Sequence, residues 1–215
     1  MNLPIIKNLK QKRRKEIAQA QDLVVREIYR NPRKVVLHGG TAIWRCYGGN
    51  RFSQDLDFYF PPDLRSGLKE LKQNLQETGV EVEKLKTTQN SLYATLRYKE
   101  RPIKFGGLFK EINKDITKQY KLVDGTNLVV NTLSPVDLLK EKVNAYLDRK
   151  KVRDLYDIYY LSKLIEDKED IEEILSELLE NYKEPKNSHQ LESLIITGVT
   201  PNTEDMLKEL KRWVK

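Results

Sequence analysis

The sequence changes its periodicity close to residue 133, and this change limits the folds open to the chain. Before this point, short runs of β-branched and aromatic residues are mixed with apolar residues at helical spacing, as in an α+β domain. After it, the spacing is helical throughout. Ser134, Pro135 and Asp137 provide a capping hydroxyl, a proline at the first helical position and an acid in the first turn. We therefore predict an α+β core over residues 1–133 and a helical lobe over 134–215 that packs on it.

Individual elements follow from the same patterns and from the glycine and proline residues between them. Strands are predicted over 35–38, 55–60, 80–85, 92–98 and 102–109, with a further hairpin in which Asp124-Gly125 separates Leu122-Val123 from Leu128-Val129-Val130. Helices are predicted behind the basic run 10–15 as far as Asn31-Pro32, over 41–47, from 63 to Gly79, and over 135–149, 153–165, 170–182, 188–196 and 203–214.

Composition favours a polyanionic partner and excludes several other classes of protein. The chain has 215 residues and a formal net charge of +7, and lysine and arginine side chains gain binding energy against phosphates by releasing counterions. The basic run Lys10–Lys15 by itself is more typical of a solvated helix face than of a nucleic-acid contact. No apolar run reaches the roughly 20 residues of a membrane span, and the first residues lack the pattern of a secretory signal. We therefore predict a cytoplasmic protein without a membrane partner.

Two acids on one predicted strand carry the strongest indication of chemistry. Asp55 and Asp57 are separated by a single residue, so on a strand both side chains project from the same face, about 7 Å apart along the backbone. Like charges at this spacing repel each other unless a cation or another donor offsets them. An exposed strand face is the commoner explanation of a D-x-D pattern alone, whereas a divalent cation bound to triphosphate oxygens is the functional one.

The residues before these acids favour the functional explanation. A strand is followed by Gly39, Gly40 and Thr41 at the beginning of a helix, where glycine lets the backbone approach a phosphate and free N–H groups attract an anion. Arg51 could donate to phosphate oxygens or brace the loop, and these roles are equally supported by the sequence. Ser53 could also donate to phosphate, although loop bracing is commoner for a short hydroxyl side chain.

Two blocks of sequence resemble the AbiEii-type nucleotidyltransferase toxins. The first is H-G-G-T-A-I-W-R-C-Y-G-G-N-R-F-S-Q-D-L-D-F, from His38 to Phe58. The second lies within Leu138–Leu161 and contains Lys142 and the sequence R-D-L-Y-D from Arg153 to Asp157. Together the two blocks anchor the resemblance over roughly residues 30 to 165.

The resemblance implies a nucleotidyltransferase-type mixed sheet flanked by helices, related to DNA polymerase β, with a helical lobe after it. It implies a toxin of a toxin–antitoxin or phage-defence system, with an antitoxin protein as a possible partner. Asp55 and Asp57 would hold Mg²⁺ and the nucleoside triphosphate, and a nucleotide would pass either to RNA, with tRNA as one such acceptor, or to a protein hydroxyl. Lys142 would reach the triphosphate, and Asp154 would join the catalytic residues.

The sequence departs from this family pattern at one position. Related active sites have a third acid on a neighbouring strand, but the strand 103–109 contains Gly106 where that acid is expected, and Glu111 is the closest acid to it. A second hypothesis therefore stays open, in which the same fold is a non-catalytic module that binds nucleotide or RNA. Within the R-D-L-Y-D segment, Asp157 could join the site or pair with Arg153, and the neighbouring tyrosines could stack a base or belong to the core.

Overall fold

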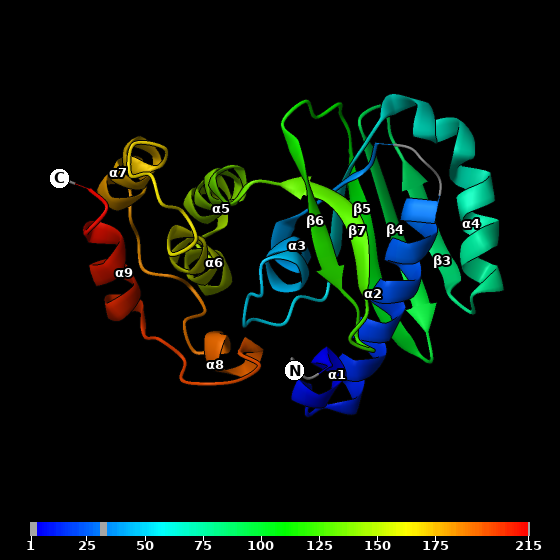
Figure 1. Cartoon of the computed structure of the whole chain (residues 1–215), viewed down its shortest axis with the longest axis horizontal. Coiled ribbons are helices and arrows are strands. Elements are labelled where there is room, and N and C mark those ends of the chain that lie inside the picture. The colour runs from blue at the N-terminus through cyan, green and yellow to red at the C-terminus, as the bar shows by residue number, and fades with distance from the viewer. Residues whose placement is uncertain (1–3, 31–33, 215) are drawn as a thin grey trace. The chain divides into compact units, whose positions relative to one another are not determined.

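The computed structural model describes residues 4–30 and 34–214, which form two compact units. The first unit comprises residues up to Gly48 together with Phe52–Thr132. The second comprises Gly49–Arg51 and the chain from Leu133 onward. The first unit has the expected α+β architecture, and the second is helical (Figure 1).

A seven-stranded mixed sheet forms the centre of the first unit, in the order β3-β4-β5-β2-β1-β7-β6. At its middle, β1 (Val36–His38) runs antiparallel to β2 (Leu56–Phe60) and parallel to β7 (Asn127–Leu133). On the other side of β2 lies the parallel strand β5 (Arg101–Phe109), followed by the antiparallel strands β4 (Ser91–Tyr98) and β3 (Glu81–Thr87). The remaining strand, β6 (Asp115–Lys121), forms the edge beside β7.

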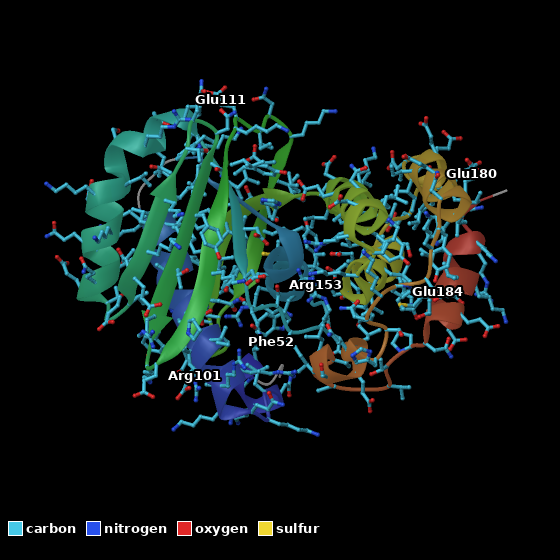
Figure 2. All side chains as sticks on the ribbon, turned by 180° about the vertical axis from the view of Figure 1, so that it is seen from behind. Phe52, Arg101, Glu111, Arg153, Glu180 and Glu184 are labelled. Atoms are coloured by element: carbon cyan, nitrogen blue, oxygen red, sulfur yellow. The ribbon has the colours of Figure 1, made fainter. Side chains whose placement is uncertain are left out.

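One face of this sheet is apolar and is covered by helices. Phe58 and Phe60 of β2 pack edge-on against Phe105 of β5, and all three side chains are buried. Leucines at helical spacing on α4 (Leu68–Glu77) face this side of β4 and β5, as their stripe in the sequence predicts. The long helix α2 (Lys12–Arg30) lies in front of the strands in Figure 1 and behind them in the reverse view of Figure 2.

Some element boundaries differ from the predictions. A 3₁₀ helix, η1 (Pro62–Gly67), begins at the second proline of the pair, so α4 begins at Leu68 and not at residue 63. The predicted hairpin is formed by β6 and β7, but β6 ends at Lys121, just before the predicted Leu122-Val123, and the short helix α1 (Ile5–Asn8) was not predicted. The turn at Asp124-Gly125 is confirmed, because Gly125 has a positive φ of 94° and donates its N–H to the carbonyl of Leu122. The predicted end of the first helix at Asn31-Pro32 lies outside the described residues.

The second unit is built from α5 (Pro135–Arg149), α6 (Val152–Ser162), α7 (Glu172–Glu180), α8 (Gln190–Leu194) and α9 (Thr203–Lys211). The Ser134 cap is confirmed, since its hydroxyl oxygen accepts the N–H of Asp137 at 3.1 Å. Asn202 caps α9 in the same way. Apolar side chains of these helices are buried, among them Leu139, Val143 and Leu155.

The short segment Gly49–Arg51 belongs with the second unit although its neighbours on both sides belong to the first. The Asn50 carbonyl accepts the N–H of Ile196 at 2.9 Å, and the Asn50 side chain accepts two hydrogen bonds from Thr197. Arg51 forms an isolated antiparallel bridge with Ile195. Residues 49–51 are thus fixed to the chain near residue 196.

No helix within residues 4–30 and 34–214 combines the length and the apolar character that crossing a membrane requires.

Candidate active site

The two acids of the D-x-D pattern lie on the less covered face of β2. Burial alternates along this strand: Leu56, Phe58 and Phe60 are buried, whereas Asp55, Asp57 and Tyr59 are partly exposed. Asp55 directly precedes the strand, so its side chain falls on the same face as that of Asp57. The alternation of burial agrees with the predicted face of the carboxylate pair.

The bend formed by Gly39 and Gly40, which we call the diglycine bend, lies beside Asp57. His38 is the register partner of Asp57, and α3 (Gly39–Cys46) begins immediately after His38. Gly39 has a φ of +71°, and a Cβ placed on it would lie 2.6 Å from Oδ2 of Asp57. Helix α3 thus begins two residues earlier than predicted. Its first residue, Gly39, can lie against the Asp57 carboxylate because glycine has no side chain.

Thr41 connects the helix to the other acid. Its buried hydroxyl donates to the backbone carbonyl of Asp55 at 2.6 Å. On the same loop, the Ser53 carbonyl accepts a hydrogen bond of 2.9 Å from the Gln21 side chain of α2. Both loop ends are thus held in place, while the predicted contacts of Gly40, Thr41 and Ser53 with phosphate stay predictions.

We expect Gly39→Ala to reduce nucleotidyl transfer at least tenfold. The new methyl group must displace the Asp57 carboxylate, and the left-handed backbone conformation costs about 1–2 kcal/mol of stability for a residue other than glycine. The measurement combines urea unfolding with the rate of nucleotide incorporation by the folded fraction.

Gly79→Ala is the matched control for this change. Gly79 also has a positive φ, of 81°, but no atom lies within 4 Å of a Cβ placed there. It should lose a similar amount of stability and keep its activity. Equal activity of the two variants would show that Gly39 is needed for its backbone conformation alone.

The position of the expected third acid is occupied by a glycine in register with Asp57. Gly106 of β5 is the partner of Asp57 on one side and of Tyr93 in β4 on the other. A Cβ on Gly106 would lie 2.8 Å from the carbonyl oxygen of Leu92, too close for any side chain without a shift of the backbone. Glu111 follows the end of β5 and lies at the end of the sheet, so it does not take this place (Figure 2).

The donor set suits a magnesium ion bound together with phosphates. Mg²⁺ commonly takes one or two carboxylates from a protein and completes its octahedron with substrate phosphates and water. Asp55 and Asp57 provide such a pair. Across residues 4–30 and 34–214, no group of three or more His, Cys, Asp or Glu side chains is placed to hold a metal. The remaining ligands would have to come from the nucleotide and water.

A second group of predicted residues forms a buried ionic network inside the helical unit. Arg51 donates from Nε and Nη2 to the two oxygens of Asp157, at 2.8 and 2.7 Å. Lys142 lies between the two acids of α6, with Nζ 2.8 Å from Asp157 and 3.6 Å from Asp154. Arg149 holds Asp154 through two hydrogen bonds of 2.7 Å. Asp154 and Asp157 therefore share a helix face, and Asp157 pairs with Arg51 rather than Arg153.

This network explains what several predicted residues do in the fold. The paired guanidinium of Arg51 supports its bracing role, and the Lys142 ammonium is engaged by two carboxylates. Their predicted contacts with the triphosphate stay predictions, as does a catalytic role for the fully buried Asp154. Tyr156 is buried in α6, which agrees with the core alternative for this tyrosine.

The charge of Asp157 should contribute to stability down to acidic pH. Burial alone would raise the pKa of its carboxyl. The positive charges of Arg51 and Lys142 outweigh this effect and lower the pKa to about 2. A carboxyl with a depressed pKa stabilises the fold above its unfolded pKa of about 3.9, and the contribution is lost as pH falls through its folded value.

We therefore expect wild type to lose about 2 kcal/mol of unfolding free energy through Asp157 between about pH 5 and pH 2. Urea unfolding of wild type and Asp157→Asn at each pH measures this. The gap between the two proteins should narrow as pH falls, because asparagine does not titrate. A constant gap would contradict the depressed pKa.

The first unit also contains a buried ion pair, which was not predicted from the sequence. Arg45 of α3 is fully buried, pairs with Asp22 of α2, and places its guanidinium 4.6 Å from the centre of the Trp44 ring and 4.8 Å from that of Tyr120. Asp22 also accepts the N–H of Val123 at 2.7 Å. Arg45 is the one charged residue of α3, and this was the available sequence signal for a buried ion pair.

Comparison with known proteins identifies the family. The model of the nucleotidyl transferase AbiEii toxin family, from type IV toxin–antitoxin systems, matches residues 31–212. The chain belongs to this family. It is thus a nucleotidyltransferase of the AbiEii type, and the resemblance of the two sequence blocks is confirmed. No curated protein sequence matches the chain.

Solved structures support the fold of this AbiEii family member. MenT4, a nucleotidyltransferase toxin of Mycobacterium tuberculosis, is 16% identical with a TM-score of 0.60, over 94% of this chain and 82% of its own. A Helicobacter pylori protein described as a nucleotidyltransferase is 18% identical with a TM-score of 0.65, over 94% and 93%. JHP933 of Helicobacter pylori is 17% identical with a TM-score of 0.63, over 94% and 90%. The nucleotidyltransferase-type fold is therefore confirmed.

Proposed function

We propose that this AbiEii family member transfers a nucleotide from a nucleoside triphosphate to an RNA acceptor, with tRNA as the leading candidate, in a reaction that requires Mg²⁺. The observation that carries the proposal is the pair formed by Asp57 of β2 and Asp55 directly before it, both partly exposed, with Gly39 in contact with Asp57. The net charge of +7 favours a polyanionic acceptor over a protein hydroxyl.

In this reaction an acceptor hydroxyl gives its proton to solvent water and its oxygen forms a bond to the α-phosphorus of the triphosphate. The bond between that phosphorus and the oxygen bridging to the β-phosphate breaks, and pyrophosphate leaves. Bound Mg²⁺ would supply charge neutralisation of the triphosphate and of the departing pyrophosphate.

The residues of the first unit orient this step. Asp55 and Asp57 would hold the ion, and Thr41 fixes the start of the strand that carries them. The N-terminus of α3 provides backbone N–H groups and a positive dipole end next to Asp57, which suits the phosphate chain. Gly106 leaves the opposite side of Asp57 without a third carboxylate.

Incorporation of label from each of the four α-³²P-labelled triphosphates tests the proposal. The full chain is incubated with total tRNA and either Mg²⁺ or EDTA, and the products are separated before and after ribonuclease or protease treatment. Magnesium-dependent label that ribonuclease removes is the expected result. Label on protein alone would replace the RNA acceptor by a protein hydroxyl.

The alternative, a non-catalytic nucleotide- or RNA-binding module, rests on the glycine at position 106. It predicts RNA or nucleotide binding without label transfer under any of these conditions. An antitoxin partner is also proposed from the family. Coexpression with the neighbouring gene product should relieve growth inhibition caused by the chain if that product is the antitoxin.

A further inference from the structure

The sheet face that carries Asp57 continues across β5, β4 and β3 as a partly exposed surface. Residues in register across a sheet point to the same face, so Asp57, Gly106, Tyr93 and Lys86 form one row across four strands. Helix α4 faces the alternate residues of β4 and β5, on the opposite side. This row therefore leads directly away from the candidate metal site.

The glycine in the row forms a gap between Asp57 and an aromatic ring. Tyr93 is 43% exposed, and its Cδ2 atom lies 3.5 Å from the place where a Cβ on Gly106 would be. The ring thus leans over the glycine, toward the strand that carries Asp57. On the neighbouring row, Leu108 is 47% exposed beside its partner Tyr59.

Basic side chains surround these apolar groups. Lys84 and Lys86 of β3 and Lys104 of β5 are exposed, and their register places them on the same face as Tyr93. We name Tyr93, Leu108 and these three lysines the sheet platform. Lys110 adds a further positive charge, with its ammonium 5.6 Å from the centre of the Tyr59 ring. Arg97 farther along β4 is neutralised by Glu83.

We infer that the sheet platform binds the single-stranded end of the acceptor RNA, with Tyr93 stacking on a base next to the reacting hydroxyl. Exposed aromatic rings and lysines on a sheet match the two requirements of a flexible RNA strand, which are stacking for its bases and positive charge for its phosphates. The inference rests on the proposed function for the identity of the reacting end, but RNA binding itself can be measured without transfer.

The two flanks of Asp57 distinguish the acceptor from the triphosphate. On the β1 side, Asp57 is bordered by His38 and by the Gly39 bend at the N-terminus of α3, which suits phosphates. On the β5 side it is bordered by Gly106 and then by the exposed Tyr93 ring. An acceptor on the sheet platform would thus reach Asp57 from the side opposite to the diglycine bend.

Binding of a fluorescein-labelled single-stranded RNA of about 12 nucleotides with a free 3′ hydroxyl tests this inference. Fluorescence anisotropy is measured with the full chain, without triphosphate or metal. Tyr93→Ala should weaken binding about tenfold, because loss of stacking on one base has roughly this effect. Tyr93→Phe should stay within about twofold of wild type, because the ring is retained. Unfolding curves verify that both variants are folded.

Lysine variants separate the platform from general charge. Lys86→Ala should weaken binding about threefold and reduce its salt dependence. Lys69→Ala removes an exposed lysine from α4, which packs on the other face, and should leave binding unchanged. Equal losses for the two lysine variants, or wild-type affinity in Tyr93→Ala, would overturn the inference.

Transfer kinetics separate this inference from the proposed function. If Tyr93→Ala weakens RNA binding but wild type transfers no label, the platform stands and the transfer reaction fails. If wild type labels RNA while Tyr93→Ala keeps its affinity and KM for RNA, the reaction stands and the platform fails. A raised KM for the triphosphate alone would assign Tyr93 to the incoming nucleotide and overturn the inference.

Discussion

Asp57→Asn should reduce nucleotide incorporation by at least about 100-fold, with little change in stability. The substitution keeps the shape of the side chain next to Gly39 and removes the charge that would hold the metal ion. Loss of one group that stabilises transition-state charge costs about 10²–10³ in rate. Asp55→Asn should have a similar effect. Single-turnover incorporation of labelled triphosphate, with RNA in excess, measures the loss.

A neutralised acid elsewhere in the same unit serves as the control. Glu70→Gln changes an exposed side chain of α4 from carboxylate to amide and should keep wild-type activity. RNA binding by Asp57→Asn in the absence of metal should also stay within a few-fold of wild type, because only the transfer step is affected. Transfer by both aspartate variants at more than one tenth of the wild-type rate would eliminate the carboxylate pair as the metal site.

Asp157→Ala should destabilise the protein by about 3–5 kcal/mol. Its carboxylate accepts two hydrogen bonds from Arg51 and forms an ion pair with Lys142, and all three side chains are buried. Removing one partner of a buried ion pair leaves an uncompensated charge in a medium of low dielectric constant. Urea unfolding of the full chain, followed by far-UV circular dichroism, measures the free-energy change.

Two comparisons isolate the buried charge from the loss of packing. The double variant Arg51→Met, Asp157→Leu should recover much of the lost stability, since no unpaired guanidinium is left and the volume is retained. Glu209→Ala breaks the exposed pair between Glu209 of α9 and Arg212 just after it, and should change stability by less than about 1 kcal/mol. If Asp157→Ala costs no more than Glu209→Ala, the network is not a source of stability.

Local sequence patterns were sufficient for most of the sheet and for the start of the helical unit. Alternation along Asp55–Phe60 predicted both the strand and the face of its acids, and the Ser134 cap predicted the beginning of α5. The first strand of the hairpin was placed too late in the sequence, because β6 is an edge strand with mostly exposed polar residues, whose alternation is weak. The 3₁₀ turn η1 was missed because its spacing resembles the first turn of a helix.

Side-chain partners distant in the chain could not be predicted from these patterns. Arg51 and Asp157 are separated by 106 positions, and no spacing rule connects them. Local reasoning could only offer Arg153 as the partner of Asp157 on the same helix. The register of β2 with β5, which places Gly106 beside Asp57, likewise became definite only with the pairing of the strands.

The short segment Gly49–Arg51 limits how this chain could be cut into two fragments. A fragment that starts at residue 133 would contain Asp157 and Lys142 but not the guanidinium that completes their network. A fragment that ends at residue 132 would contain Arg51 without Asp157, the carboxylate with which it pairs. A single cut thus gives no intact half, and recombination between relatives would have to exchange residues 49–51 together with the distal helices to preserve charge balance.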